Sequence, residues 1–366
     1  MEDVWDDNFF ADLIRKKDLL ADLLLKQECI ASEKSRVKWL HEGDRNIGFF
    51  HACITEKHRH LSPNLLLEDG TYSNEREVVG KMADNFFKSL LAAPNPNLIG
   101  GYPSGPSELF DVILSIVSEE VNDMMKDVPG EDEIKEVVWS INIASAPGPD
   151  TFPASFYRST WDTVKRSLID VLQDFFHGVN LPRVACVTKI VLVPKIKDPL
   201  SLNHYRPIIL CNVPYKVLVG ILNKWLALFL PQWVSEEQHG FVKGRTIQGA
   251  IDLDQEVISD INLKSFGRNL VIKLDMNKAY DRVEWSFINR FLACMGFSVW
   301  ITDILVRCFS SPWLAVSFMR KQFGLFKAIR GLRQGDHISP SLFVIAQDVL
   351  SWFFSHCIDV GKGIPF

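Results

Sequence analysis

Residues 269–285 read Asn-Leu-Val-Ile-Lys-Leu-Asp-Met-Asn-Lys-Ala-Tyr-Asp-Arg-Val-Glu-Trp, and the fold class follows from them more directly than from any other stretch. The mostly apolar run from Leu270 to Leu274 predicts a buried strand, and a helical pattern begins at Asn277. Asp275 ends the strand-like run. A carboxylate at the end of a buried strand needs a partner, and a divalent cation is one such partner. The alternative is an ordinary carboxylate in a turn or a helix cap.

A second unusual string, Arg330-Gly-Leu-Arg-Gln-Gly-Asp336, precedes a helix start at Ser339-Pro340. Gly335 permits a close backbone approach, although a turn glycine has the same appearance. Together the two strings resemble the palm of the reverse transcriptases of non-LTR (LINE-type) retrotransposons, of the plant kind. Two further segments resemble the same family, Arg206-Pro-Ile-Ile-Leu210 and Phe241-Val-Lys-Gly-Arg245.

The resemblance implies a role for each matching residue. Asp275 would be the catalytic carboxylate and, with the backbone carbonyl of Met276, a ligand of Mg²⁺ or Mn²⁺. Tyr280 would be the steric gate at the ribose. The implied nucleotide-binding residues are Arg206, Tyr280, Gln334 and Gly335, and the implied nucleic-acid contacts are Lys195, Lys197, Arg245 and Arg333. The implied partners are an RNA template, a DNA primer and dNTPs. For each lysine alone, a solvated surface charge is the simpler interpretation.

The order of elements predicts an α+β fold. Residues 1–93 are expected to form a helical connector and N-terminal extension, including an amphipathic helix over 8–35, and four prolines between Pro94 and Pro106 mark residues 94–130 as a linker and lead-in. Residues 131–366 are expected to form the reverse transcriptase domain. The predicted strands are 189–194, 206–211, 314–319 and 324–329, and the predicted helices are 131–143, 153–179, 214–229, 247–263, 285–296, 300–310 and 339–357. By resemblance, this domain would comprise the fingers and part of the palm of a right-hand polymerase, without the thumb.

The family carries two further catalytic carboxylates on a later strand, in an aromatic-Ala-Asp-Asp sequence. This chain has one Asp-Asp pair, Asp6-Asp7, outside any strand pattern. The resemblance therefore predicts a copy truncated within the palm, an RNA-directed DNA polymerase (a nucleotidyltransferase) by family but without polymerase activity of its own. Two alternatives remain: a non-catalytic RNA-binding relic, and an RNA-binding protein similar to intron maturases.

The net charge of −5 is unevenly distributed. Residues 183–366 hold 22 Lys and Arg against 14 Asp and Glu, a net +8, which leaves −13 for residues 1–182. The second half is therefore the half expected to attract phosphate backbones. Seven cysteines without a Cys-x-x-Cys pair, an acidic N-terminus and no apolar run of ~18–20 residues predict an intracellular location, cytoplasmic or nuclear, and no membrane partner. The sequence does not indicate an oligomeric state.

Overall fold

The computed structural model describes residues 65–67, 70–92, 98–99, 102–103, 108–111, 113–260, 274–319 and 321–359, together with seven residues between Arg15 and Lys26. The chain divides into two compact units, Met1–Asn74 and Glu75–Phe366. In the first unit, the seven described residues of the predicted amphipathic helix are helical. A hairpin joins β1 (Leu65–Leu66) to β2 (Tyr72–Ser73) in the same unit, and Gly70 in its turn has a φ of +81°.

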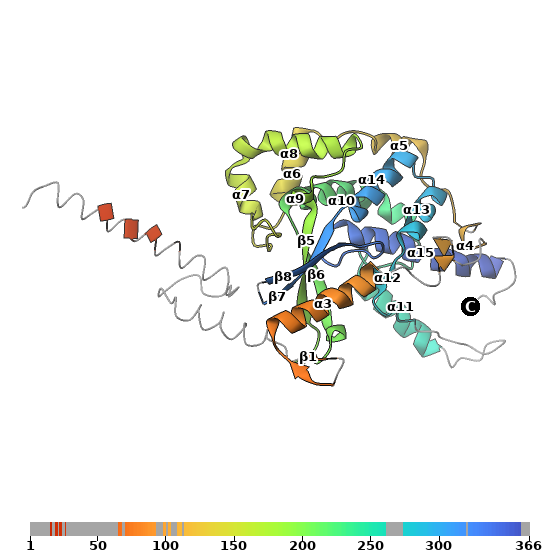
Figure 1. Ribbon diagram of the computed structural model, residues 1–366. Helices are drawn as coiled ribbons and strands as arrows, with labels where there is room; N and C mark the ends of the chain where they lie inside the picture. The colour runs from red at the N-terminus through yellow and green to blue at the C-terminus, as the bar shows by residue number, and fades with distance from the viewer. Residues whose placement is uncertain are drawn as a thin grey trace, which may run out of the picture. The chain divides into compact units, whose positions relative to one another are not determined.

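The second unit is built on a four-stranded mixed sheet with the strand order β6-β5-β7-β8 (Figure 1). Its strands are β5 (Val187–Pro194), β6 (Tyr205–Cys211), β7 (Trp313–Phe318) and β8 (Lys321–Lys327). Strand β5 pairs antiparallel with β6 and parallel with β7, and β7 pairs antiparallel with β8. Along β5, Thr188, Ile190 and Leu192 are buried and the residues between them are less so, which is the period-two pattern of a half-buried strand.

Helix α3 (Arg76–Leu91) packs on β7 and β8. The contact requires Gly80, because a Cβ at that position would lie 2.3 Å from the ring of Phe323. Val79 and Phe87 on the same helix are buried. Helix α3 therefore belongs to the compact unit that contains the sheet. The boundary between the two compact units lies between residues 74 and 75, because this helix buries its apolar face against the sheet, and the domain bounds predicted from the sequence stay predictions.

The other described helices of this unit surround the sheet (Figure 1). They are α4 (Glu108–Asp111), α5 (Glu119–Met124), α6 (Glu131–Ser140), α7 (Ala154–Ser159), α8 (Trp161–Phe176), α9 (Arg183–Cys186), α10 (Val213–Trp233), α11 (Ile247–Asp260), α12 (Ala279–Arg282), α13 (Trp285–Cys294), α14 (Val299–Ser310) and α15 (Ile338–Asp359). Helix α10 contacts α6, α8, α9, α14 and α15. Because α10 is apolar on almost every side, it occupies the centre of the helical layer.

Among the residues that the structure describes, two helices are long and apolar enough to cross a membrane by length and composition alone, Val213–Trp233 and Ile338–His356. Their apolar windows are 50% and 44% buried within the structure, and the core helix of a folded domain passes the same test. The sequence search for one uninterrupted apolar run missed both, because Asn223 and Lys224 interrupt the first and Gln347 and Asp348 interrupt the second.

The mixture of helices and sheet confirms the predicted α+β class. The predicted strands are displaced by three residues or fewer at each end. The predicted helix over 153–179 is two helices, α7 and α8, which meet at Thr160, where φ is −110° and ψ is 18°. The predicted linker contains a short paired hairpin, β3 (Leu98–Ile99) and β4 (Tyr102–Pro103). The strand predicted before Asp275 falls on 270–273, outside the described residues, and Leu274 itself is not in a strand.

Candidate nucleotide and nucleic-acid site

The two sequence strings that carry the resemblance lie side by side in the structure. The Leu332 amide donates a hydrogen bond to the Tyr280 carbonyl (2.7 Å), and the Gly331 amide donates one to the Val283 carbonyl (2.7 Å). An antiparallel bridge and a 3.4 Å ion pair between Glu284 and Arg330 continue the same ladder. Segments that are about fifty residues apart in the sequence are therefore held together by their backbones.

The loop at the end of the second string, which contains Gln334 and Gly335, runs alongside strand β6. The Ile209 amide donates a hydrogen bond to the Gln334 carbonyl (2.9 Å). Gly335 has a φ of +102°, and a Cβ at this position would lie 3.1 Å from the Ile209 carbonyl oxygen. Both features require glycine, because other residues rarely adopt this conformation and their Cβ would crowd the strand. The loop therefore presents Gln334, half-buried, and Gly335, exposed, beside the strand that carries Arg206.

Three predicted cationic residues lie at one end of the β5–β6 pair. Arg206 is exposed, and its partner across the pair is Val193. Lys195 and Lys197 are exposed in the connection that follows β5. The Lys195 amide donates to the His204 carbonyl (2.8 Å), and its Nζ donates to the Asn203 carbonyl (3.2 Å). The structure therefore brings these three positive charges together on an accessible surface.

The first string places its candidate residues at the start of α12. Asp275 and Met276 are exposed. Lys278 adopts a left-handed conformation with a φ of +53°, and α12 begins at the next residue. Tyr280 is half-buried, and its ring stacks on Phe343 with a centroid distance of 4.5 Å and an interplanar angle of 16°. The stack fixes the plane of the tyrosine ring, which a gating residue would need.

Asp281 is a buried carboxylate that the sequence did not single out. Its exposed fraction is 6%, and burial raises the pKa of its carboxyl from 3.8 to about 6, although Lys278, Lys195 and Arg282 oppose the shift. The influence of Lys195 places the tip of the β5–β6 pair near α12. The carboxyl lines a cavity of about 20 Å³ between the two strings, with room for about one water molecule. The feature of the sequence that could have pointed to Asp281 is its position directly between Tyr280 and Arg282.

Arg333, for which the resemblance implies a nucleic-acid contact, is buried and has its partners within the protein. Arg333 is 7% exposed, and its guanidinium pairs with Asp336 (Nη1 to Oδ2, 3.3 Å). It also donates to the Tyr215 hydroxyl and to the Phe309 and Cys308 carbonyls. A charge can be buried only if it is paired and hydrogen-bonded in this way. Arg333 is thus a structural residue that ties the loop to α10 and α14.

The Arg245 guanidinium also has its hydrogen-bond partners within the protein. Its half-buried guanidinium donates to the carbonyls of Pro231 (3.0 Å), Val234 (3.1 Å), Gln238 (2.7 Å) and Ser235. These carbonyls lie at and just beyond the C-terminus of α10, where a cation is electrostatically favourable. Because its donors are committed to this turn, the structure does not support the predicted phosphate contact.

Two oxygen-bearing groups at the exposed edge of this site suit a divalent cation. Asp275 offers a carboxylate and Met276 a backbone carbonyl, both of which are suitable ligands for Mg²⁺ or Mn²⁺. No group of three or more His, Cys, Asp or Glu side chains in the described part of the chain is arranged to hold a metal. Asp275 and the Met276 carbonyl are therefore the ligands that the described residues would offer to a divalent cation.

Comparison with known proteins agrees with this geometry. Residues 193–360 match the family described as reverse transcriptase (RNA-dependent DNA polymerase). The chain is 26% identical over 337 residues to the transposon TX1 uncharacterized 149 kDa protein of Xenopus laevis, across 92% of this chain and 25% of that protein. It is 26% identical over 236 residues to a retrovirus-related Pol polyprotein from the type-2 retrotransposable element R2DM of Drosophila melanogaster, across 60% of this chain and 21% of that protein.

A Pol polyprotein from the type-1 retrotransposable element R2 of Nasonia vitripennis is 25% identical over 219 residues, across 60% of this chain and 20% of that protein. The chain thus spans a quarter or less of the length of these relatives. The family match begins in β5 and ends just beyond α15, so it includes both strings, β6 and the loop at Gly335. Residues 193–360 are therefore a reverse transcriptase domain, of the kind that non-LTR retrotransposons carry.

Proposed function

We propose that the chain supplies the fingers and part of the palm of an RNA-directed DNA polymerase. The observation that carries this proposal is the backbone ladder between residues 280–284 and 330–332, which puts Tyr280 beside the loop of Gln334 and Gly335. In this assignment β5 and β6 belong to the fingers, and residues 274–359 belong to the palm. The partners would be an RNA template, a DNA primer and dNTPs.

Each accessible or partly accessible residue of the site would have a part in nucleotide binding. Arg206 suits triphosphate oxygens, because a guanidinium donates two parallel hydrogen bonds to them, and Lys195 and Lys197 add positive charge nearby. Tyr280, held flat against Phe343, would pack where a ribose 2′ hydroxyl would sit. Asp275 and the Met276 carbonyl would hold the divalent cation. When bound, that cation stabilises the attacking 3′ oxygen and the leaving pyrophosphate.

Catalysis by two metals needs carboxylates besides Asp275 to hold the second ion. The Asp-Asp pair of this sequence is Asp6-Asp7, which precedes the reverse transcriptase domain. Loss of either metal costs several kcal/mol of transition-state stabilisation, and each ~1.4 kcal/mol is a factor of ten in rate. A polypeptide of residues 1–366 is therefore expected to bind primed RNA without extending the primer.

Primer extension tests the assignment. Residues 1–366 would be assayed alone and joined to the Ala-Asp-Asp strand and thumb of a related reverse transcriptase, with primed RNA, Mg²⁺ and all four dNTPs. We expect no extension by the first protein, extension by the second, and loss of that extension in its Asp275→Asn variant. Asp170→Asn on the exposed side of α8 is the matched control and should remain active. Extension by residues 1–366 alone, or extension by the joined protein that is indifferent to Asp275→Asn, would contradict the proposal.

The RNA-binding alternative makes a different prediction for the joined protein. If the chain is a relic that holds RNA without chemistry, the joined protein will bind RNA in a salt-dependent way and incorporate no nucleotide. The two functions therefore separate in a single preparation, because binding and extension are measured on the same protein.

A further inference from the structure

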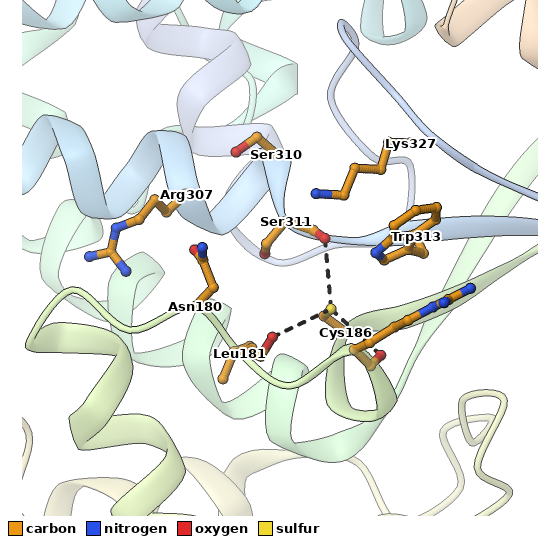
Figure 2. Close-up of a pocket in the computed structure, with 9 residues that line it drawn as sticks. Asn180, Leu181, Cys186, Arg307, Ser310, Ser311, Trp313 and Lys327 are labelled. Atoms are coloured by element: carbon orange, nitrogen blue, oxygen red, sulfur yellow. Dashed lines mark hydrogen bonds between the residues drawn. The ribbon is translucent and has the colours of Figure 1, made fainter.

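A larger cavity of about 260 Å³ lies at the other end of strand β5 (Figure 2). It is formed where α9, the C-terminus of α14 and the first residues of β7 meet, and Trp313 in its wall pairs with Val187, the first residue of β5. Lys195 lies just past the last residue of the same strand. Eight residues of extended chain span roughly 25 Å, so this pocket is separate from the candidate nucleotide site.

Among the described residues, three cations line the pocket, Arg183, Arg307 and Lys327, and none of the described lining residues is a carboxylate. The guanidinium carbon of Arg183 lies 4.5 Å from the centroid of the Trp313 ring, and the Lys327 Nζ lies 5.4 Å from the same centroid. Figure 2 shows Trp313 and Lys327 on one side of the pocket and Arg307 on the other. The positive charges therefore enclose the cavity from opposite sides.

Arg307 is the most constrained of the three cations. Its Nε pairs with Asp303 (2.6 Å), its Nη1 donates to the Phe175 carbonyl (2.9 Å), and its guanidinium carbon lies 4.4 Å from the Phe175 ring centroid. Asp303 neutralises part of this charge from outside the pocket. Arg183 and Lys327 are exposed, so two positive charges remain to be balanced.

The polar group that the pocket wall offers to a ligand is the amide of Asn180. Asn180 lines the pocket and is exposed, and its side-chain nitrogen can donate hydrogen bonds. The Ser311 side-chain oxygen makes no hydrogen bond with any residue that the structure describes, but it has no accessible surface and therefore does not face the cavity.

The cysteine in the pocket wall does not supply a reactive thiolate. Cys186 is 2% exposed, and burial raises the pKa of its thiol even though Arg333, Lys327 and Arg183 act to lower it. The thiol lies within weak hydrogen-bonding distance of the Ser311 carbonyl (3.7 Å) and the Leu181 carbonyl (3.9 Å). It stays protonated and neutral, so the pocket retains its positive charge.

We propose that this pocket binds a phosphate group. The charge selects an anion, and the Asn180 amide can donate to its oxygens. The cavity is smaller than the ~300–1,000 Å³ of sites for drug-sized ligands. Because two cations already lie over the Trp313 ring, the pocket recognises charge rather than a base. The phosphate can be a phosphodiester of a nucleic-acid strand or a free phosphate ion, and the chemistry of recognition is the same for both.

Calorimetric titration of residues 1–366 with inorganic phosphate, at constant ionic strength with chloride as the reference, tests the site. We expect binding to the unmodified chain and at least roughly tenfold weaker binding to an Arg183→Ala/Lys327→Ala variant, since charge-assisted hydrogen bonds to the anion are lost. An Arg166→Ala/Lys243→Ala variant removes two exposed charges elsewhere and should bind like the unmodified chain. Equal binding by both double variants would overturn the proposal, as would no binding by the unmodified chain.

Asn180→Ala keeps all three charges and guards against an effect of misfolding. Its Tm without phosphate should not fall, because Asn180 is exposed, and its phosphate affinity should decrease. Phosphate affinity that is unchanged in Asn180→Ala would count against the pocket. These readouts do not depend on polymerase activity, so their failure is distinct from failure of the proposed function.

A labelled single-stranded RNA then identifies the source of the phosphate. If the pocket takes a phosphodiester, loss of two cation contacts should reduce the slope of log K against log [salt] by about 1.4, at ~0.7 per contact. If RNA binding is the same in the two double variants and phosphate binding differs, the ligand is a free phosphate.

Discussion

Replacement of Arg333 by methionine tests whether its charge is structural. Arg333 and Asp336 are each 7% exposed and form a 3.3 Å ion pair. Removal of one partner of a buried pair leaves the other charge unpaired, which costs about 3–5 kcal/mol. For a unit of about 290 residues, at about 2.1 cal/mol/K per residue, this corresponds to a fall in Tm of roughly 5–8 °C. The exposed arginine of the same site is the control, and Arg206→Met should change stability by no more than about 0.5 kcal/mol.

The defect in Arg333→Met should also depend on pH. Burial already raises the pKa of the Asp336 carboxyl, and loss of the arginine removes the main influence that lowers it. The folded variant then binds a proton more tightly than the unfolded chain does, so its stability is lost as the pH rises through the folded-state pKa. Urea denaturation should therefore show a larger difference from the unmodified chain at pH 8 than at pH 5.

A second substitution separates the loss of an ion pair from the loss of side-chain volume. Arg333→Met/Asp336→Leu removes both charges, and exchange of a buried pair for apolar residues is often neutral or stabilising. It should recover most of the stability that Arg333→Met loses. The structural role would be refuted if Arg333→Met unfolds like the unmodified chain and loses RNA affinity as Arg206→Ala does.

Three further predictions concern the same site. Gly335→Ala should destabilise the fold more than Gly178→Ala. Both positions have a positive φ, so alanine at either one costs about 1–2 kcal/mol of backbone strain. Of the two, only Gly335 lies against Ile209, where a Cβ would be 3.1 Å from the carbonyl oxygen. Equal losses in urea denaturation would contradict this contact. Asp281→Asn should stabilise the fold at pH 8 by up to about 3 kcal/mol and by much less at pH 4. The reason is that folding raises the pKa of the Asp281 carboxyl from 3.8 to about 6, so the fold loses stability as the pH increases between these two values. A difference in the free energy of unfolding that does not vary with pH would contradict the burial of a titrating carboxyl. Arg206→Ala should weaken RNA binding and reduce its salt slope by about 0.7 for one lost phosphate contact, whereas Arg166→Ala should have no such effect.

Periodicity and motif spacing were sufficient for much of the fold. Strands β5 and β6 and helices α10 and α14 lie within four residues of their predicted bounds, since alternation of apolar residues and an unbroken apolar face are properties of a local segment. The resemblance of residues 269–285 and 330–336 also assigned two distant segments to one nucleotide site. The ladder from Tyr280 to Glu284 shows that the two segments lie side by side, and their role in nucleotide binding stays a prediction.

Side-chain exposure depends on segments that are remote in the sequence, so the local sequence pattern did not predict which side chains are exposed. Arg333 and Arg206 both matched a family motif, but Arg333 points into a space formed by Tyr215 and Phe309, while Arg206 stands on an open strand end. The burial of Asp281 likewise depends on residues about fifty positions later. The phosphate pocket needs three cations from α9, α14 and β8. These cations come together when β5 and β7 pair in parallel, because a parallel pair brings the start of one strand beside the start of another strand from a distant part of the chain.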